Sequence, residues 1–102
     1  MSNLAVAHTI LQQLGGNRFK MMTGAKDFIG DESSLTFRIP RAKDGINKVK
    51  VTLDFGMDLY TVEFIKVDFK KFTFDVVHTS DQVYSDDLER EFTEHTGLYT
   101  RL

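Results

Sequence analysis

The chain contains no cysteine, a single proline and no long apolar run. The missing cysteines exclude disulfide bonds, thiolate metal sites and a cysteine nucleophile, and they fit a reducing compartment. No apolar stretch approaches the roughly 18 residues that a membrane-spanning helix needs, and the N-terminus lacks the basic start and apolar core of a signal peptide. We therefore expect a cytoplasmic protein that does not enter a membrane.

Charged side chains are missing altogether from residues 1–17 and are unevenly divided over the rest of the chain. Residues 18–71 hold eleven Lys and Arg against eight Asp and Glu, whereas residues 72–102 hold two against seven. The formal net charge of −2 excludes a generally basic nucleic-acid coat, but the uneven division predicts two surfaces of opposite sign. The plainer explanation, solvation together with the preference of helix starts for acids, stays open.

The middle of the chain shows a two-residue alternation of polar and apolar side chains, which is typical of strands buried on one face. The alternation is clearest from Ile46 to Phe55. Residues 24–27 read as a turn that follows the first of the expected strands. The strands predicted in this way are 18–23, 35–39, 46–55, 59–67 and 69–77.

Two segments show the three- and four-residue spacing of an amphipathic helix. The first is 3–14, which the pair Gly15 and Gly16 is placed to end, and the second is 86–96, which begins after Ser85. The length of 102 residues allows one domain with one modest core. The prediction is a single α+β domain over residues 1–102: an N-terminal helix, a mainly antiparallel sheet of about five strands, and a C-terminal helix, with both helices packed on the apolar face.

The predicted last helix carries carboxylates on most of its faces. A solvated helix with acids near its start explains this composition without any partner, and a docking surface for a basic protein is the functional alternative. The candidate protein-binding residues are Asp86, Asp87, Glu89, Glu91 and Glu94.

A group of basic residues is predicted on the polar face of the sheet. Arg38, Lys48 and Lys50 project from the same side of adjacent strands, with Arg41 and Lys43 in the loop between them. Such a group can follow a phosphate backbone, although sheet-based binders usually add exposed aromatic rings on the same face. Here the aromatic residues fall mostly on the apolar side, with Tyr60 as the one exception, and an ordinary solvated face is the alternative.

The chain has no convincing catalytic or metal-binding motif. The histidines His8, His78 and His95 lie on three different predicted elements, and none has another histidine or a suitable carboxylate pair at a metal-ligand spacing. His78 with Ser80 has the residue types of a base and a nucleophile, but such residues are common in loops between strands and helices. We expect no catalytic residue, no metal and no cofactor.

Three stretches resemble a family of small proteins encoded by bacteriophages, prophages and conjugative elements. They are residues 14–26 with the sequence LGGNRFKMMTGAK, residues 58–64 with DLYTVEF, and residues 92–100 with FTEHTGLYT. The resemblance implies a short accessory protein of a mobile element that acts in a bacterial cytoplasm. Small proteins of such elements often inhibit host defence, anti-CRISPR proteins among them.

The function predicted from these observations is non-covalent binding. The first hypothesis is a mobile-element protein that binds and inhibits a host or defence protein. The second is a nucleic-acid-binding accessory protein that uses the basic residues of the sheet. The uncharged outer side of the first helix also permits a homodimer.

Overall fold

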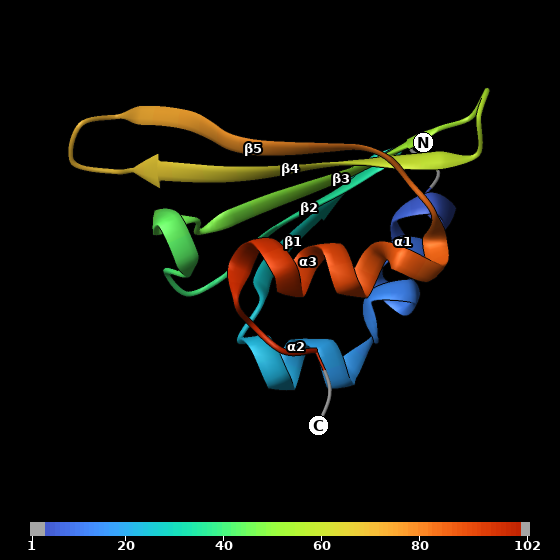
Figure 1. Ribbon diagram of the computed structural model, residues 1–102, viewed down its shortest axis with the longest axis horizontal. Helices are drawn as coiled ribbons and strands as arrows, with labels where there is room; N and C mark the ends of the chain where they lie inside the picture. The colour runs from blue at the N-terminus through green and yellow to red at the C-terminus, as the bar shows by residue number, and fades with distance from the viewer. Residues whose placement is uncertain (1–3, 101–102) are drawn as a thin grey trace.

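The computed structural model describes residues 4–100, and it has the α+β fold that the sequence predicts (Figure 1). A five-stranded antiparallel sheet has helices on one side only, and the first and last helices of the chain both lie there. The helices are α1 (Ala5–Leu14), α2 (Asn17–Thr23) and α3 (Leu88–Thr96), with 3₁₀ turns η1 (Lys43–Gly45) and η2 (Ser85–Asp87). The strands are β1 (Lys26–Gly30), β2 (Ser34–Arg38), β3 (Lys48–Asp54), β4 (Leu59–Asp68) and β5 (Thr73–Val83).

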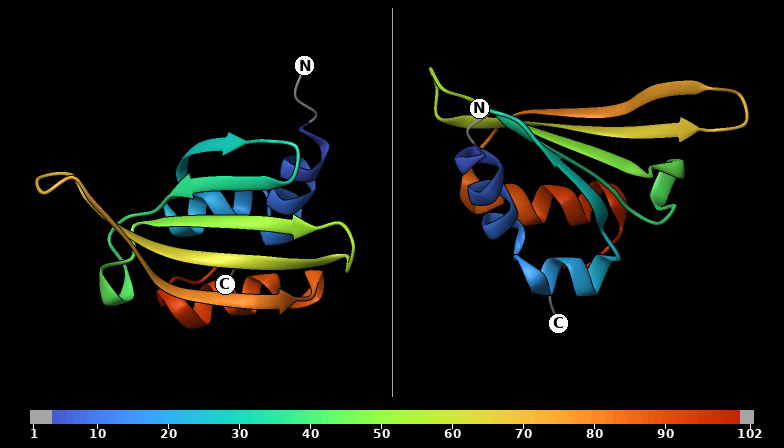
Figure 2. Two further views of the ribbon diagram at one scale, coloured as in Figure 1. Left: turned by 90° about the horizontal axis from the view of Figure 1, so that it is seen from above. Right: turned by 180° about the vertical axis from the view of Figure 1, so that it is seen from behind.

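The strands follow one another across the sheet in chain order, from β1 at one edge to β5 at the other (Figure 2). β4 lies between β3 and β5, as expected for a strand with apolar residues on both faces. Its Phe64 is buried on the helix side, opposite Val49 of β3. The next residue, Ile65, pairs with Lys48 and is therefore buried on the other side of the sheet.

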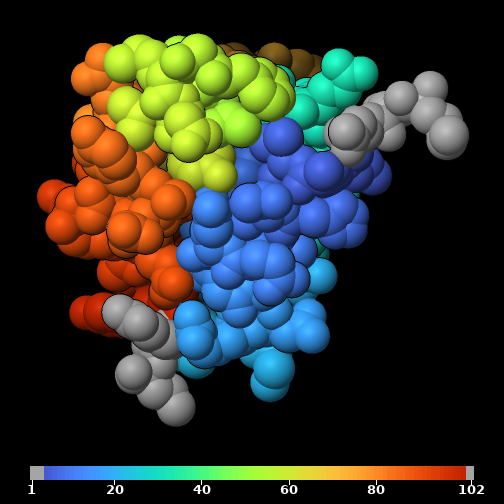
Figure 3. All heavy atoms as spheres, turned by 90° about the vertical axis from the view of Figure 1, so that its right-hand side faces the viewer, coloured from blue at the N-terminus to red at the C-terminus, as the bar shows by residue number. Residues whose placement is uncertain are grey.

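The hydrophobic core fills the space between the sheet and the helices. Ile10 of α1 and Phe92 of α3 are fully buried there, as is Phe37 of β2. Phe19 of α2 closes the cluster, with edge-to-face ring contacts at 5.3 Å to Phe37 and 5.0 Å to Phe92. The end-on view of Figure 3 shows α1 and α2 packed directly beside α3. The prediction that both terminal helices cover the apolar face is confirmed.

The strand predicted over 18–23 is wrong, because this segment is the helix α2. Phe19 and Thr23, four residues apart, are buried, whereas Met21 between them is 86% exposed. That period is the helical one, and the Thr23 hydroxyl donates a hydrogen bond to the Phe19 carbonyl 2.7 Å away. Burial of Phe19 and Thr23, one helical turn apart, therefore overrides the strand-like composition.

The turn predicted over 24–27 is also wrong at its end, since β1 begins at Lys26. This strand lacks the alternation that identifies the others because a bulge interrupts its pairing with β2, and Asp27 has a φ of 56° there. Gly30 ends the strand beneath α1, where a Cβ atom would lie 2.6 Å from the Cβ of Ala7. The close packing of α1 on β1 therefore requires glycine at this position.

The last strand begins later than predicted. The prediction of 69–77 becomes β5 from Thr73, and residues 69–72 form the turn of the β4–β5 hairpin instead. The apolar residues Phe72, Phe74 and Val76 were expected on the buried face, but they are 93%, 58% and 45% exposed.

The pairing of β5 with β4 gives the reason for this reversal. Val76 pairs with Ile65, so both lie on the side of the sheet away from the helices. A bulge beyond this pair changes the phase of the strand and places His78 opposite Phe64, on the helix side. The pairing, rather than the hydrophobicity of β5, decides which side chains are covered.

The predicted ends of the helices are close to the observed ones. Residue 3, the expected first residue of α1, lies outside the described residues, and Gly15 ends that helix with a φ of 126°. The first residues of the segment predicted over 86–96 form η2, and Gly97 ends α3 in the left-handed conformation. Between residues 4 and 100, no helix is both long and apolar enough to cross a membrane.

The segment after α3 was expected to pack on the rest of the protein. Leu98 packs against the core, and Thr100 is buried and accepts a hydrogen bond from the Arg18 side chain at 3.2 Å. Tyr99, in contrast, is 70% exposed, and Leu102 lies outside the described residues. The segment is therefore held by Leu98 on the core, by the Arg18 side chain of α2 and by Glu89 of α3.

Candidate nucleic-acid interface

Three of the predicted basic residues lie together on the open face, by which we mean the side of the sheet away from the helices. Arg38 of β2 is directly opposite Lys48 of β3, and Lys50 follows two residues along β3 on the same side. The alternating residues on the other side, such as Phe37 and Val49, are buried in the core. Among residues 4–100, Figure 1 shows no helix over this side of the sheet.

Each of the two paired cations lies over an exposed aromatic ring. The Arg38 guanidinium is 4.9 Å from the ring centre of Phe69, and the Lys48 ammonium is 6.0 Å from that of Phe74. Phe69 and Phe74 are 60% and 58% exposed. The expectation that the aromatic residues fall on the apolar side is therefore wrong for these two. Tyr60, the expected exception, is buried on the core side, where its hydroxyl donates to the Gln13 side chain at 2.6 Å.

The two cations and one of these rings enclose a small hollow of about 110 Å³. It is lined by Arg38, Asn47, Lys48, Val67 and Phe69. The Asn47 side chain is fixed there, because its amide donates to the Val67 carbonyl and accepts from the Val67 N–H, both at 2.9 Å. Two hydrogen bonds to the Val67 backbone thus hold Asn47 in place in the hollow, whereas of the two cations Arg38 is exposed and Lys48 is half-buried.

Two of the three cations on the open face have an acidic side chain as an ion-pair or cross-strand partner, and in the described part of the chain the third, Lys48, does not. Arg38 forms an exposed ion pair with Asp27 at 3.3 Å, and Lys50 is directly opposite Glu63. Within residues 4–100, Lys48 forms no ion pair, and it stands directly opposite the like charge of Arg38. Like charges in such a cross-strand pair destabilise a sheet, and a bound anion removes that cost.

The other two predicted basic residues are separated by the fold. Arg41 lines a second hollow of about 420 Å³ beside the first, together with Phe69 and two lysines that were not predicted, Lys66 and Lys70. Lys43 lies on η1, which contacts α3 on the helix side. The second hollow is also lined by Gly45 of η1, so Arg41 lies between the open face and η1 rather than on the open face itself. Lys43 lies outside both hollows.

The hairpin arm, residues 67–74, projects beyond the other strands at the end of the sheet that carries Arg38 and Lys48 (Figures 1 and 2). Its turn is held by Asp68, whose carboxylate accepts from the N–H groups of Lys70 and Lys71. Phe72 at the tip is 93% exposed and has a φ of 54°, a conformation that is strained for a bulky side chain. The arm thus presents two lysines between two exposed rings.

The acids of the last helix are largely engaged by the protein itself. Glu89 accepts from the Thr100 hydroxyl at 2.6 Å, and Glu91 accepts from the Ser80 hydroxyl at 3.2 Å. Asp87 pairs with Arg90 at 3.3 Å. In the part of the chain that the structure describes, only Asp86 and Glu94 of the five predicted residues form neither an ion pair nor a side-chain hydrogen bond. Both line a shallow hollow beside α3.

The histidines are closer together than the sequence suggests. His78 of β5 stacks on His95 of α3 with ring centres 3.9 Å apart, whereas His8 is exposed on α1. The expectation that no histidine has a carboxylate pair at a ligand spacing is wrong, because ligand atoms of Glu91, Glu94 and His95 lie within 4.8 Å of one another. The i, i+3, i+4 spacing of these residues on one helix was the signal that could have shown it.

Burial raises the pKa of Tyr60 above its ordinary value of 10.0, in keeping with a neutral phenol under α1. The pKa of Asp31 lies below its ordinary value of 3.8, first because the backbone N–H of Ser33 donates to its carboxylate. Tyr60 lies on the core side, whereas the positive charge of Lys50, on the open face, is a minor contributor to the lowered pKa of Asp31.

Comparison of the chain with protein-family models, with curated proteins and with solved structures finds no match.

Proposed function

We propose that the protein binds single-stranded nucleic acid on the open face of its sheet. The observation that supports this best is the pair Arg38 and Lys48, directly opposite each other, each over an exposed phenylalanine ring. Single-strand binders combine cations that follow the phosphates with aromatic rings on which unpaired bases stack. Both components are present within one small area of this face.

A single strand fits this surface better than a duplex does. The exposed rings of Phe69 and Phe74 can stack only on bases that are turned outward, and in a duplex the base faces are covered by their neighbours. The strand would pass from Lys50 across Arg38 and Lys48, and it would continue along the hairpin arm. The exposed ion pair between Arg38 and Asp27 is weak, so a phosphate can replace the carboxylate.

Fluorescence anisotropy with labelled oligothymidylate and oligouridylate tests the proposal. We expect binding at low salt that weakens steeply as salt rises, and strong loss of affinity when Lys48 and Lys50 are changed to Glu. The matched control is Lys43→Glu, which alters the net charge of the chain in the same direction on η1, away from the open face. Undetectable binding at low salt would refute the proposal, as would a Lys43→Glu effect equal to that of Lys48→Glu.

The second candidate function is that of a mobile-element protein that binds and inhibits a host or defence protein in the bacterial cytoplasm. It is favoured by the hollow of about 540 Å³ beside α3, where Asp86 and Glu94 form no ion pair within residues 4–100 and lie next to the exposed ring of Tyr99. Unpaired acids beside an exposed aromatic ring suit a basic protein surface.

A pull-down from host lysate, with and without nuclease, separates the two functions. A protein that persists after nuclease treatment and is lost on Asp86→Asn with Glu94→Gln supports inhibition. Asp87, Glu89 and Glu91 are unsuitable for this test because their changes also remove internal contacts. Retention that disappears with the nucleic acid supports the open face instead.

A further inference from the structure

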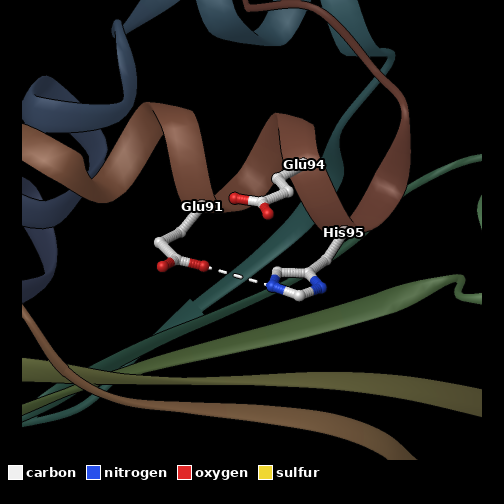
Figure 4. A group of neighbouring side chains, drawn as sticks. All are labelled: Glu91, Glu94 and His95. Atoms are coloured by element: carbon white, nitrogen blue, oxygen red, sulfur yellow. Dashed lines mark ion pairs between the residues drawn. The ribbon is translucent and has the colours of Figure 1, made fainter.

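One turn of α3 gathers three metal-ligating side chains on the side of the sheet opposite to the open face. Glu91, Glu94 and His95 each offer one ligand atom, and these atoms all lie within 4.8 Å of one another. Figure 4 shows the two carboxylates and the imidazole turned toward a common point beside the helix. The i, i+3 and i+4 positions of a helix face the same way, which is why a single turn suffices to bring them together.

Two of the three side chains are held in place by the sheet. The His95 ring packs against two rings of the sheet, His78, stacked at 3.9 Å, and Phe64, whose ring centre is 5.0 Å away. The Ser80 hydroxyl donates to Oε2 of Glu91 at 3.2 Å. Contacts of this kind orient the ligands of metal sites from outside the coordination sphere. His95 and Glu91 are also only 25% and 24% exposed, so the position is partly shielded from water.

The cluster lacks a positive partner. Among residues 4–100, no lysine or arginine forms an ion pair with Glu91 or Glu94, and the only ionisable group paired with either is His95. His95 Nε2 lies 3.2 Å from Glu91 Oε2. Two ligands bound at about 2.0–2.1 Å to one tetrahedral ion are about 3.4 Å apart, so this pair already has nearly the separation that a shared ion requires.

We propose that Glu91, Glu94 and His95 form a binding site for a divalent first-row transition ion, for which Zn²⁺ is the probe. One imidazole and two carboxylates suit Zn²⁺ and its neighbours, whereas Mg²⁺ binds all-oxygen sites and gives up its water reluctantly. Three protein ligands leave the remaining coordination positions to water. The ion would replace the direct contact between His95 Nε2 and Glu91 Oε2 and neutralise the two carboxylates. This site is separate from the proposed nucleic-acid interface.

Isothermal titration calorimetry of the untagged full-length protein with Zn²⁺ tests the proposal. We expect one Zn²⁺ per chain, no heat with Mg²⁺, and at least a tenfold loss of affinity in His95→Gln and in Glu94→Gln. Glu94 is exposed and forms no ion pair or side-chain hydrogen bond with the described residues, so its variant should fold like the wild type, as circular dichroism will show. The matched controls are His8→Gln and Glu32→Gln, both at exposed positions away from the cluster.

A second readout is thermal unfolding. Zn²⁺ should raise the melting temperature of the wild-type protein and leave that of Glu94→Gln unchanged, since an ion that binds only the folded state stabilises it. Ser80→Ala, which removes the positioning hydroxyl, should weaken Zn²⁺ binding about tenfold. Absence of Zn²⁺ binding overturns the proposal. So does binding that survives both His95→Gln and Glu94→Gln, or that is lost equally in His8→Gln.

Discussion

The phenylalanines on the two sides of the sheet have opposite environments. On the helix side Phe19, Phe37 and Phe92 are fully buried and touch one another edge-on or at a tilt. On the open face Phe69 and Phe74 are more than half exposed, with cations rather than rings as neighbours. The comparison teaches that the count of aromatic residues in a chain of this size does not measure its core, because some of the rings are held where a ligand can reach them.

The largest expected effect is a difference in stability between two variants, each of which shortens one phenylalanine on one side of the sheet. Phe37→Ala should lower the free energy of unfolding by about 3–5 kcal/mol, because it leaves a cavity among packed rings. Phe74→Ala should change it by less than about 0.5 kcal/mol, as expected for an exposed side chain. Urea denaturation measures both values. Similar losses in the two variants would show that the open face is part of the stabilising core.

The second effect concerns binding on the open face. Phe74→Ala should weaken oligothymidylate binding by about 1–3 kcal/mol, the usual contribution of one stacked base. Phe55→Ala is the matched control, since Phe55 is 67% exposed but follows the opposite end of β3 from Lys48. Anisotropy titrations at one fixed salt concentration compare the two variants. Equal losses would mean that any exposed ring suffices, which contradicts a defined interface.

At the tip of the hairpin arm, Phe72 has a strained backbone conformation and an exposed ring. A change at this residue should therefore affect the stability of the fold and the affinity for a single strand in opposite directions. Phe72→Gly should raise the free energy of unfolding by about 1 kcal/mol, because glycine adopts the positive φ of this position without strain. The same change should reduce single-strand affinity if the arm contacts the ligand. Thermal unfolding measures the change in stability, and fluorescence anisotropy measures the change in affinity. A lower melting temperature of Phe72→Gly would contradict the assignment of backbone strain.

A smaller effect on stability distinguishes two acids of α3, Glu89, whose side chain forms polar contacts within the protein, and Glu94, whose side chain forms none with the described residues. Glu89→Gln should cost about 1 kcal/mol of stability, since it weakens the hydrogen bond from Thr100 and the partly screened ion pair with Arg18. Glu94→Gln should be neutral, because Glu94 makes neither kind of contact with residues 4–100. Urea denaturation without added metal provides the comparison. An unchanged free energy of unfolding in Glu89→Gln would contradict a stabilising role for Glu89, which would then again be a candidate residue of the docking surface.

The smallest effect is the acid dependence that Asp31 contributes. Its pKa is lower in the folded protein than its ordinary value of 3.8, mainly because the N–H of Ser33 donates to the carboxylate. The carboxylate therefore stabilises the fold above that value, and this contribution is lost as the pH falls through the folded pKa. Asp31→Asn should flatten the decline of stability in this acidic range. An unchanged decline, measured by urea denaturation from pH 5 to pH 2.5, would contradict the shift.

The fold class and one part of the interface could be predicted because they depend on local patterns. The alternation through β3 places Lys48 and Lys50 away from the core, and the spacing of Leu88 and Phe92 identifies the buried side of α3. The pairing of Arg38 with Lys48 also follows from the alternation, once β2 and β3 are taken as neighbours. Each of these predictions uses only residues within one element or two adjacent ones.

The remaining features depend on contacts between distant residues. The ring of Phe74 faces outward because the length of the β4–β5 turn and a bulge near Phe64 fix the phase of β5, and neither can be read from the apolar residues alone. Residues 17–23 are helical because Phe19 packs on Phe37 and Phe92, which come from other elements. Sequence reasoning therefore missed the aromatic half of the candidate interface for the same reason that it missed α2.

The most direct test of the central claim is chemical-shift mapping of the ¹⁵N-labelled protein during titration with oligothymidylate. The proposed interface predicts shifts that concentrate at Arg38, Lys48 and residues 67–74, with the amides of α1 and α2 unchanged. Shifts confined to α3, or no shifts at low salt, would contradict the claim that the open face of the sheet binds single-stranded nucleic acid.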